Sequence, residues 1–276
     1  RPNRQRLGPG VTMVNDASSS NPKPQPQPDN VRPLPNKRQG LRRGIYLLPN
    51  LITTGALFSG FYSIISSMTG DIEQAAIAIV IAGFLDSLDG RVARLTNTQS
   101  EFGVQYDSLS DLVAFGVAPA LLMFSWVLAD LGKLGWFVAF LYMACAALRL
   151  ARFNTAPDSK VFFGLASPGA AGTIAALAWV WHDNVQQSAG LEFGLPFAVL
   201  AGVLAVLMVS NIRYYSPKEF DFGGRVPFLF MVTIVFLFVV VAVYPPGMLL
   251  IIGLTYAASG PIGSLLRRRR RNPDGD

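Results

Sequence analysis

Charged residues are scarce in this sequence, and cysteine and histidine occur once each. Only 14% of the 276 residues are charged and 51% are hydrophobic, whereas about 25% of the residues in an ordinary soluble domain are charged. This composition excludes a typical water-soluble domain and indicates an integral membrane protein. The single cysteine, Cys145, excludes a disulfide within the chain and is expected to be a small buried apolar residue. The single histidine, His182, has no partner for a metal site.

Apolar segments follow one another from residue 45 onward, separated by brief polar breaks with turn residues such as Gly70 and Gly132. Because about 20 apolar residues cross the hydrocarbon core, we expect an all-α integral membrane protein, a helical bundle of about eight transmembrane helices. The last two spans are close enough to form a hairpin instead. The expected spans are 45–68, 73–93, 104–129, 133–153, 168–187, 192–212, 226–244 and 246–266.

Proline and polar residues fill the segment before the first span, which cannot bury enough apolar surface to fold. We expect a disordered, basic, proline-rich tail over residues 1–43, a polytopic membrane domain over 44–266 and a short basic tail over 267–276. All lysines and arginines except Lys133 fall on one side of the expected spans. By the positive-inside rule, we expect both termini to be cytoplasmic. The net charge of +6 follows from this asymmetry, so no nucleic-acid partner is expected.

Four aspartates interrupt the second and third expected spans, although an ionised aspartate at the centre of a membrane helix costs roughly 2.5–3.5 kcal/mol. Asp86 and Asp89 are three residues apart, and Asp107 and Asp111 are four apart, so each pair shares a helix face. Small residues recur beside them, which lets helices approach closely and leaves room for a ligand. These small residues are Gly83, Gly90 and Ala93 on one helix and Gly103, Ala114 and Ala118 on the other.

A cluster of carboxylates selects hard cations such as Mg²⁺ or Mn²⁺, and three or four carboxylates can hold two ions that bind a pyrophosphate. We therefore expect two divalent cations as cofactors. One alternative is that the aspartates form salt bridges with Arg91 and Arg94. Another is a divalent-cation transporter, which would place carboxylates at mid-membrane depth beside paired broken helices.

The aspartates belong to a longer pattern, D-x2-D-G-x2-A-R-x8-G-x3-D-x3-D, which resembles the signature of the CDP-alcohol phosphotransferases. The resemblance implies a membrane enzyme, often a homodimer, that displaces CMP from a CDP-linked donor with an alcohol hydroxyl. It also implies that Asp86, Asp89 and Asp107 bind two metal ions, and that Asp111 contacts a metal and acts as the general base. The pattern is met by Asp86, Asp89, Gly90, Ala93, Arg94, Gly103, Asp107 and Asp111.

The same resemblance implies a CDP-binding pocket on the first two spans. Small side chains at Gly90 and Ala93 admit a nucleotide, and Arg94 suits a bidentate phosphate contact. The run Pro49-Asn50-Leu-Ile-Thr53 resembles the family's first-helix element, although Pro49-Asn50 equally fits a plain helix start. The expected CDP-binding residues are Asn50, Thr53, Asp86, Gly90, Ala93 and Arg94.

The aspartate pattern does not distinguish between acceptor alcohols, so residues elsewhere in the chain must determine which alcohol binds. The segments 148–154 and 163–171 resemble those typical of bacterial phosphatidylserine synthases, except that Ala166 stands where proline is expected. This resemblance implies CDP-diacylglycerol and L-serine as substrates in a bilayer of membrane lipids, the plasma membrane of a prokaryote, with the active site on the cytoplasmic side. Glycerol 3-phosphate, inositol phosphate or choline are alternative acceptors. The expected acceptor-binding residues are Arg149, Arg152, Asn154 and Ser167.

The chemistry of serine fits two of these positions in particular. Arg149 and Arg152 can form a fork for its carboxylate, and Ser167 begins a helix whose free N–H groups favour an anion. A phosphorylated acceptor would use the same two arginines. They could equally be anchors that reach the lipid headgroups.

Overall fold

The computed structural model describes residues 37–96, 98, 100–155, 163–185, 191–212, 214 and 241–271. Most of the expected N-terminal tail, most of the expected span 226–244 and residues 272–276 lie outside this part of the chain. The described residues are predominantly helical, as the sequence predicts. The longer helices are α1 (Lys37–Thr69), α2 (Ile72–Leu95), α5 (Lys133–Thr155), α6 (Ser167–Val185), α7 (Leu191–Val209) and α9 (Pro245–Arg271).

The expected span 104–129 is one helical rod from Glu101 to Leu131. It consists of α3 (Glu101–Asp111) and α4 (Ala118–Met123), with wide π-helical turns at Leu112–Val117 and Phe124–Leu128. Such turns often lie near functional sites, and the first begins directly after Asp111. The rod ends at Gly132, whose φ of +57° suits glycine better than any other residue.

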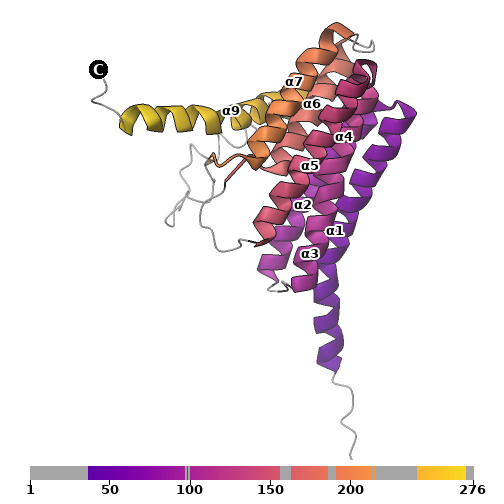
Figure 1. Cartoon of the computed structure of the whole chain (residues 1–276). Helices are drawn as coiled ribbons and strands as arrows, with labels where there is room; N and C mark the ends of the chain where they lie inside the picture. The colour runs from indigo at the N-terminus through magenta and orange to yellow at the C-terminus, as the bar shows by residue number, and fades with distance from the viewer. Residues whose placement is uncertain are drawn as a thin grey trace, which may run out of the picture.

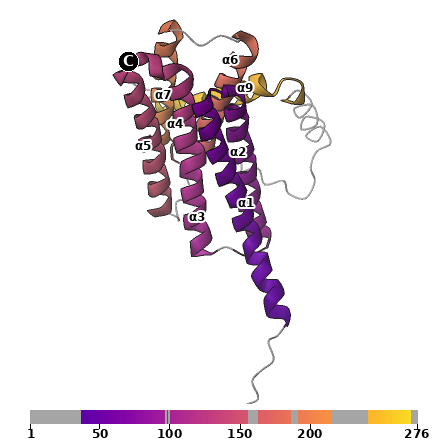
Figure 2. The same cartoon turned by 90° about the vertical axis from the view of Figure 1, so that its right-hand side faces the viewer.

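The helices α1 to α7 lie side by side in a bundle (Figures 1 and 2). Helix α1 packs along α2 and also contacts α3 and α4, while α6 packs on α2 and α5 packs on α7. Helix α2 ends and α3 begins at the same end of the bundle, where α1 projects beyond its neighbours (Figure 2). The short connection between α2 and α3 thus brings their charged ends together.

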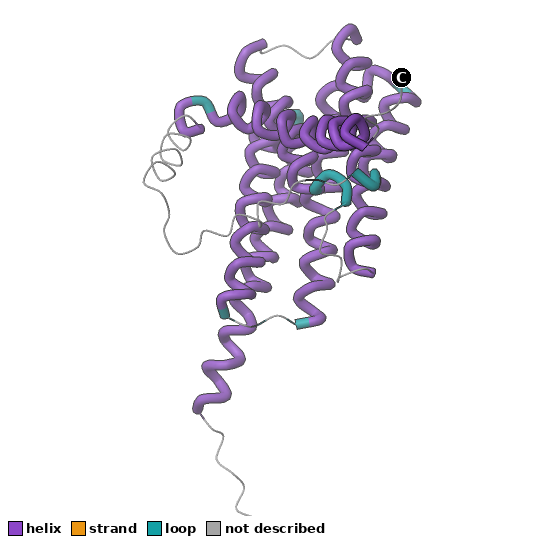
Figure 3. Tube along the Cα trace, turned by 90° about the vertical axis from the view of Figure 1, so that its left-hand side faces the viewer, coloured by secondary structure: helices purple, strands orange, loops and turns teal. Residues whose placement is uncertain are grey.

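Helix α9 differs in direction from the sequence-based expectation. The expected span 246–266 has the length and apolar composition of a membrane span, but α9 runs across the bundle instead of along it (Figures 1 and 3). It packs against α6, with Gly253 so close to Thr173 that a side chain at Gly253 would collide with it. This crossing brings the middle of α9 over the start of α6.

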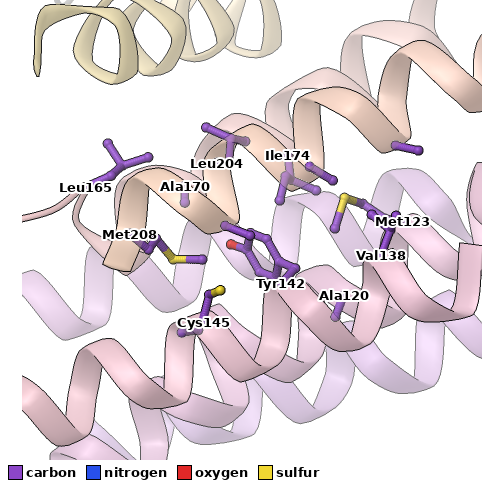
Figure 4. Close-up of a cluster of buried hydrophobic side chains, with 14 of the residues drawn as sticks. Ala120, Met123, Val138, Tyr142, Cys145, Leu165, Ala170, Ile174, Leu204 and Met208 are labelled. Atoms are coloured by element: carbon purple, nitrogen blue, oxygen red, sulfur yellow. The ribbon is translucent and has the colours of Figure 1, made fainter. Parts of the chain in front are cut away.

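Two clusters of buried apolar residues hold the bundle together. The first lies between α4, α5, α6 and α7, with Tyr142 at its centre (Figure 4). Cys145 is unpaired and buried in this cluster, which confirms the sequence-based prediction. The second cluster joins α2, α4 and α6 and is built largely from alanines, including Ala114 and Ala118. Close helix packing through small residues is the usual arrangement within a bilayer.

Within the described part of the chain, five helical stretches are long and apolar enough to cross a membrane. Helix α2 is not one of the five, and its C-terminal half carries Asp86, Asp89, Arg91 and Arg94. Many large apolar side chains on these helices are exposed, as lipid-facing residues would be. The chain is therefore a multi-pass helical membrane protein. The five stretches are Leu47–Thr69, Glu101–Leu131, Lys133–Thr155, Glu192–Val209 and Pro245–Ser264.

Gly60 allows α1 to pack closely against the rod from Glu101 to Leu131. A Cβ atom at this position would lie 2.7 Å from Cα of Ala114. We expect Gly60→Val to lower the free energy of unfolding by about 1–3 kcal/mol, because overpacking forces the two helices apart. Thermal unfolding in detergent measures the change. Gly202→Val is the matched control because a Cβ at Gly202 meets nothing within 4 Å, and an equal loss there would contradict the packing argument.

Candidate metal centre

The end of α2 presents two carboxylates on one face. Asp89 is buried, with 4% of its surface exposed, and Asp86 is half-buried one turn earlier. The helix continues past them to Leu95 and ends at Thr96, whose backbone N–H donates to the carbonyl oxygen of Val92. Both aspartates therefore lie within regular helix, which fixes their spacing.

Helix α3 presents the other two carboxylates. It begins at a serine cap, in which the Ser100 hydroxyl accepts a hydrogen bond of 3.0 Å from the backbone N–H of Gly103. Asp107 and Asp111 follow one turn apart on this helix. Because α3 starts at the end of the bundle where α2 finishes (Figure 2), its carboxylates face the pair on α2.

The structure brings all four aspartates together. Carboxylate oxygens of Asp86, Asp89 and Asp107 lie within 4.8 Å of one another. Asp111 joins them because its side chain makes a hydrogen-bond contact with Asp86 and interacts electrostatically with Asp89 and Asp107. So many like charges in one place repel one another unless a cation binds between them.

The alternative of structural salt bridges finds no support in the geometry. The one contact between acidic and basic side chains among the described residues joins His182 and Glu73 at 3.6 Å, at the opposite end of α2 from the cluster. Arg91 and Arg94 are exposed, and Nε of Arg94 donates to the carbonyl oxygen of Gly90 at 2.9 Å. The donor set is all carboxylate oxygen and contains no histidine or cysteine, which fits hard divalent cations.

Helix α1 supports the cluster through Thr53. Its hydroxyl donates a hydrogen bond of 2.8 Å to Oδ2 of Asp89, and both side chains are buried. The backbone carbonyl of Thr53 in turn accepts from the hydroxyl of Ser110 on α3 at 3.2 Å. Thr53 thus connects α2 and α3. The sequence predicted Thr53 as a nucleotide contact, and its bond to Asp89 was missed because the two residues are 36 positions apart.

The other expected CDP-binding residues surround this cluster. The side-chain oxygen of Asn50 lies against Gly103, 3.4 Å from where a Cβ at Gly103 would stand. At Gly90 a Cβ would meet nothing within 4 Å, so open space lies beside this backbone. Ala93 is half-buried one turn from Gly90, and Arg94 is exposed at the end of α2. The described side chains leave room here for a ligand.

Two of the four expected acceptor residues contact each other, and the other two have separate partners. Arg149 on α5 donates from Nη1 to the hydroxyl of Ser167, the first residue of α6, at 2.7 Å. Arg152 is exposed, with its guanidinium carbon 5.7 Å from the ring centroid of Phe163. Asn154 donates to the hydroxyl of Ser108 on α3 at 3.0 Å. Ser108 is the residue that follows Asp107 in the sequence.

Arg149 is the expected acceptor residue with the least satisfied side chain. Its Nε is buried and has no hydrogen-bond partner within the described structure. Its charge interacts with Asp111 and with the phenol groups of Tyr142 and Tyr256. An arginine that links the carboxylate cluster to a buried hydroxyl can hold an anionic ligand beside the reacting groups.

Comparison with known proteins identifies the family. The sequence model for CDP-alcohol phosphatidyltransferases matches residues 46–209. A CDP-diacylglycerol–serine O-phosphatidyltransferase of Helicobacter pylori is 40% identical over 199 residues, which cover 70% of this chain and 81% of the relative. A protein of the same name from Bacillus subtilis is 34% identical, covering 62% of this chain and 92% of its own. An archaetidylserine synthase of Methanothermobacter thermautotrophicus is 38% identical, covering 60% of this chain and 69% of its own.

Proposed function

This chain belongs to the CDP-alcohol phosphatidyltransferase family, and from that membership we propose that it transfers the phosphatidyl group of CDP-diacylglycerol to the hydroxyl of L-serine. The products are phosphatidylserine and CMP. The names of the relatives from Helicobacter pylori and Bacillus subtilis support both substrates. The carboxylate cluster at the end of α2 and α3 supports the site of reaction.

Asp86, Asp89 and Asp107 are the proposed ligands of two divalent cations, with Asp111 as a further contact. Their oxygens are close enough for shared ligands, and four carboxylates supply enough negative charge for a metal pair. When bound, Mg²⁺ or Mn²⁺ would neutralise the pyrophosphate of the donor and the charge that develops on departing CMP. Thr53 holds the Asp89 carboxylate in place by its hydrogen bond.

Asp111 is the proposed general base. It accepts the proton of the serine hydroxyl, the serine oxygen bonds to the phosphorus that carries diacylglycerol, and the bond from that phosphorus to CMP breaks. A hydroxyl is a poor nucleophile until a positioned base takes this proton. Asp111 contacts Asp86 and interacts electrostatically with Arg149. This supports the role, since Asp111 interacts with a metal ligand and with an acceptor residue.

The CDP group is proposed to lie along the last turns of α2. Gly90 offers open space, Ala93 adds little bulk, and Arg94 is exposed and able to turn towards a phosphate. Asn50 approaches this region from α1. Asp86 contributes indirectly, as a ligand of a metal ion that would also bind the pyrophosphate.

Serine is favoured over a phosphorylated acceptor by one observation, the separation of the two arginines. Arg149 faces Ser167, whereas Arg152 is exposed over Phe163. One guanidinium matches the single charge of a carboxylate, and the neighbours Tyr142 and Tyr256 add no second positive charge. We therefore assign the serine carboxylate to Arg149 and Ser167, with Asn154 near the reacting end.

The protein is proposed to lie in the plasma membrane of a prokaryote with both termini and the active site cytoplasmic. The distribution of lysine and arginine supports this orientation, and it gives serine and CDP access from the cytosol while the lipid chains stay in the bilayer. A homodimer is the proposed assembly, and native mass measurement in detergent tests it. No nucleic acid takes part in the proposed reaction.

Purified protein with CDP-diacylglycerol and Mn²⁺ or Mg²⁺ tests the reaction. CMP release is followed with serine, glycerol 3-phosphate, inositol phosphate or choline as the acceptor. We expect release with serine, and its loss on chelation of the metal. Release with glycerol 3-phosphate alone would overturn the choice of serine. The absence of CMP with every acceptor would overturn the enzyme assignment and favour the alternative of a divalent-cation transporter.

Thr53→Val tests whether the hydrogen bond to Asp89 supports metal binding. We expect about 10- to 100-fold weaker Mn²⁺ binding, because a ligand that loses its orienting partner is no longer held in position. Titration with Mn²⁺, followed by electron paramagnetic resonance, measures the affinity directly. Thr53→Ser keeps the hydroxyl and is expected to bind Mn²⁺ nearly as the wild type does. Equal affinities for the wild type and Thr53→Val would contradict this role.

A further inference from the structure

The guanidinium of Arg149 retains hydrogen-bonding capacity that the described residues do not use. Nη1 donates to Ser167, which is fully buried. Nε is also buried and has no partner in the described part of the chain. A buried N–H without an acceptor costs about 1–3 kcal/mol, so a protein seldom keeps one unless a ligand accepts from it. The unsatisfied donor therefore marks a place for an anionic group.

Helix α9 brings a phenol to the same place. The ring of Tyr256 lies over the first turn of α6, where a Cβ at Gly169 would stand 3.1 Å from Cε1 of the tyrosine. The phenol interacts electrostatically with Arg149. Tyr256 on α9 thus lies against the first turn of α6 and interacts with Arg149 on α5. The crossing direction of α9 brings the helix to this place (Figure 3).

The hydroxyl of Tyr256 lies near the backbone at the start of α6. The backbone N–H of Ala166 interacts with the phenol oxygen. A proline at position 166 would have no such N–H. The interaction with this N–H uses the oxygen of the hydroxyl and leaves its hydrogen to donate. The described residues accept no hydrogen bond from it. A tyrosine hydroxyl can make both contacts at once.

A second tyrosine fixes α9 without reaching the anion. The rings of Tyr214 and Tyr256 are 5.4 Å apart between centroids. The hydroxyl of Tyr214 donates to the backbone carbonyl of Ala257 at 3.1 Å, so its hydrogen is already used. Tyr214 therefore positions α9, and Tyr256 is the residue of this pair that has a free donor.

We propose that Tyr256 is a specificity-determining residue, whose hydroxyl donates a hydrogen bond to the carboxylate of the acceptor alongside Arg149. The inference rests on the proposed transfer to serine and adds a residue to that site. Tyr256 lies outside residues 46–209, the segment that the family model covers. Part of the acceptor site is then supplied by a helix beyond the family's common domain. One arginine and one neutral phenol suit a carboxylate, whereas a doubly charged phosphate would favour a second cation.

Tyr256→Phe tests the proposal because it removes only the hydroxyl. With the full-length protein, CDP-diacylglycerol and Mn²⁺, we expect the KM for serine to rise about 10-fold, as for the loss of one hydrogen bond to a charged group. The KM for CDP-diacylglycerol is expected to stay within about 2-fold of the wild-type value, since Tyr256 is assigned to the acceptor alone. Tyr214→Phe is the matched control. Its ring still packs against Tyr256 and holds α9 in place, so its serine KM is expected to remain near the wild-type value.

Two results would overturn the role of Tyr256. One is an unchanged serine KM in Tyr256→Phe. The other is an equal rise in Tyr214→Phe, because that would assign the effect to the docking of α9 rather than to the hydroxyl of Tyr256. A wild-type protein that releases no CMP with serine would be a different failure, since it refutes the proposed reaction and with it this inference.

Discussion

Asp111→Asn is expected to lower kcat by about 10²- to 10⁴-fold while the protein still binds Mn²⁺ and CDP-diacylglycerol. Asparagine has nearly the same shape as aspartate but cannot accept the proton of the serine hydroxyl. Asp86, Asp89 and Asp107, whose oxygens lie within 4.8 Å of one another, remain to bind metal. CMP release under saturating substrates measures the loss, and Mn²⁺ titration shows whether the metal site survives.

Asp89→Asn separates the role of a base from that of a ligand. Asp89 is buried and held by Thr53, so its replacement is expected to weaken Mn²⁺ binding first, with the loss of turnover partly restored at high Mn²⁺. Asp111→Asn is not expected to recover with added metal. Turnover of Asp111→Asn within a few-fold of the wild-type value would remove Asp111 as the base. Recovery of Asp111→Asn turnover at high Mn²⁺ would show that Asp111 is a metal ligand and not the base.

The position of the carboxylate cluster was predictable from the sequence because helical spacing and connection length determine it. Asp86 and Asp89 share a face because residues three positions apart lie on the same side of any α-helix. The segment between α2 and α3 is too short for anything but a return of the chain at the same end of the bundle, so the two pairs meet. The structure confirms this prediction.

The side-chain partners around the cluster were not predictable in the same way. The bond between Thr53 and Asp89 depends on how far α1 slides along α2, which the contacts of Gly60 with Ala114 help to fix. Spacing alone placed Arg149 and Arg152 on neighbouring faces, but Ser167 and Phe163 from beyond α5 give them separate partners. Tertiary contacts of this kind leave no local pattern in the sequence.

The direction of α9 could not be predicted from the sequence either. The apolar stretch of 20 residues in α9 has the composition of a membrane span whether the helix runs along the bundle or across it. The difference lies in its contacts with α6, such as that between Gly253 and Thr173. Tyr256 was therefore missed as a candidate site residue, since only the crossing of α9 brings it to Arg149.

Arg149→Gln is expected to lower kcat/KM for serine by about 30- to 1,000-fold, because the loss of one partner in a buried charged contact costs about 2–4 kcal/mol. Glutamine keeps a polar side chain but has no positive charge and reaches less far. The variant should leave the KM for CDP-diacylglycerol nearly unchanged. Arg152→Gln makes the same replacement at an exposed position, and an equal loss there would restore the two-arginine fork that the sequence predicted.

Ethanolamine distinguishes a lost carboxylate contact from a damaged site, because it is serine without the carboxylate. If Arg149 binds that group, the wild-type enzyme prefers serine strongly, and Arg149→Gln lowers kcat/KM for serine but not for ethanolamine. The ratio of the two values then falls by the same factor as the serine value. A general disturbance of α5 or of the bond to Ser167 would lower both values together and leave the ratio unchanged. An unchanged ratio would therefore show that Arg149 maintains the structure of the site and does not choose the acceptor.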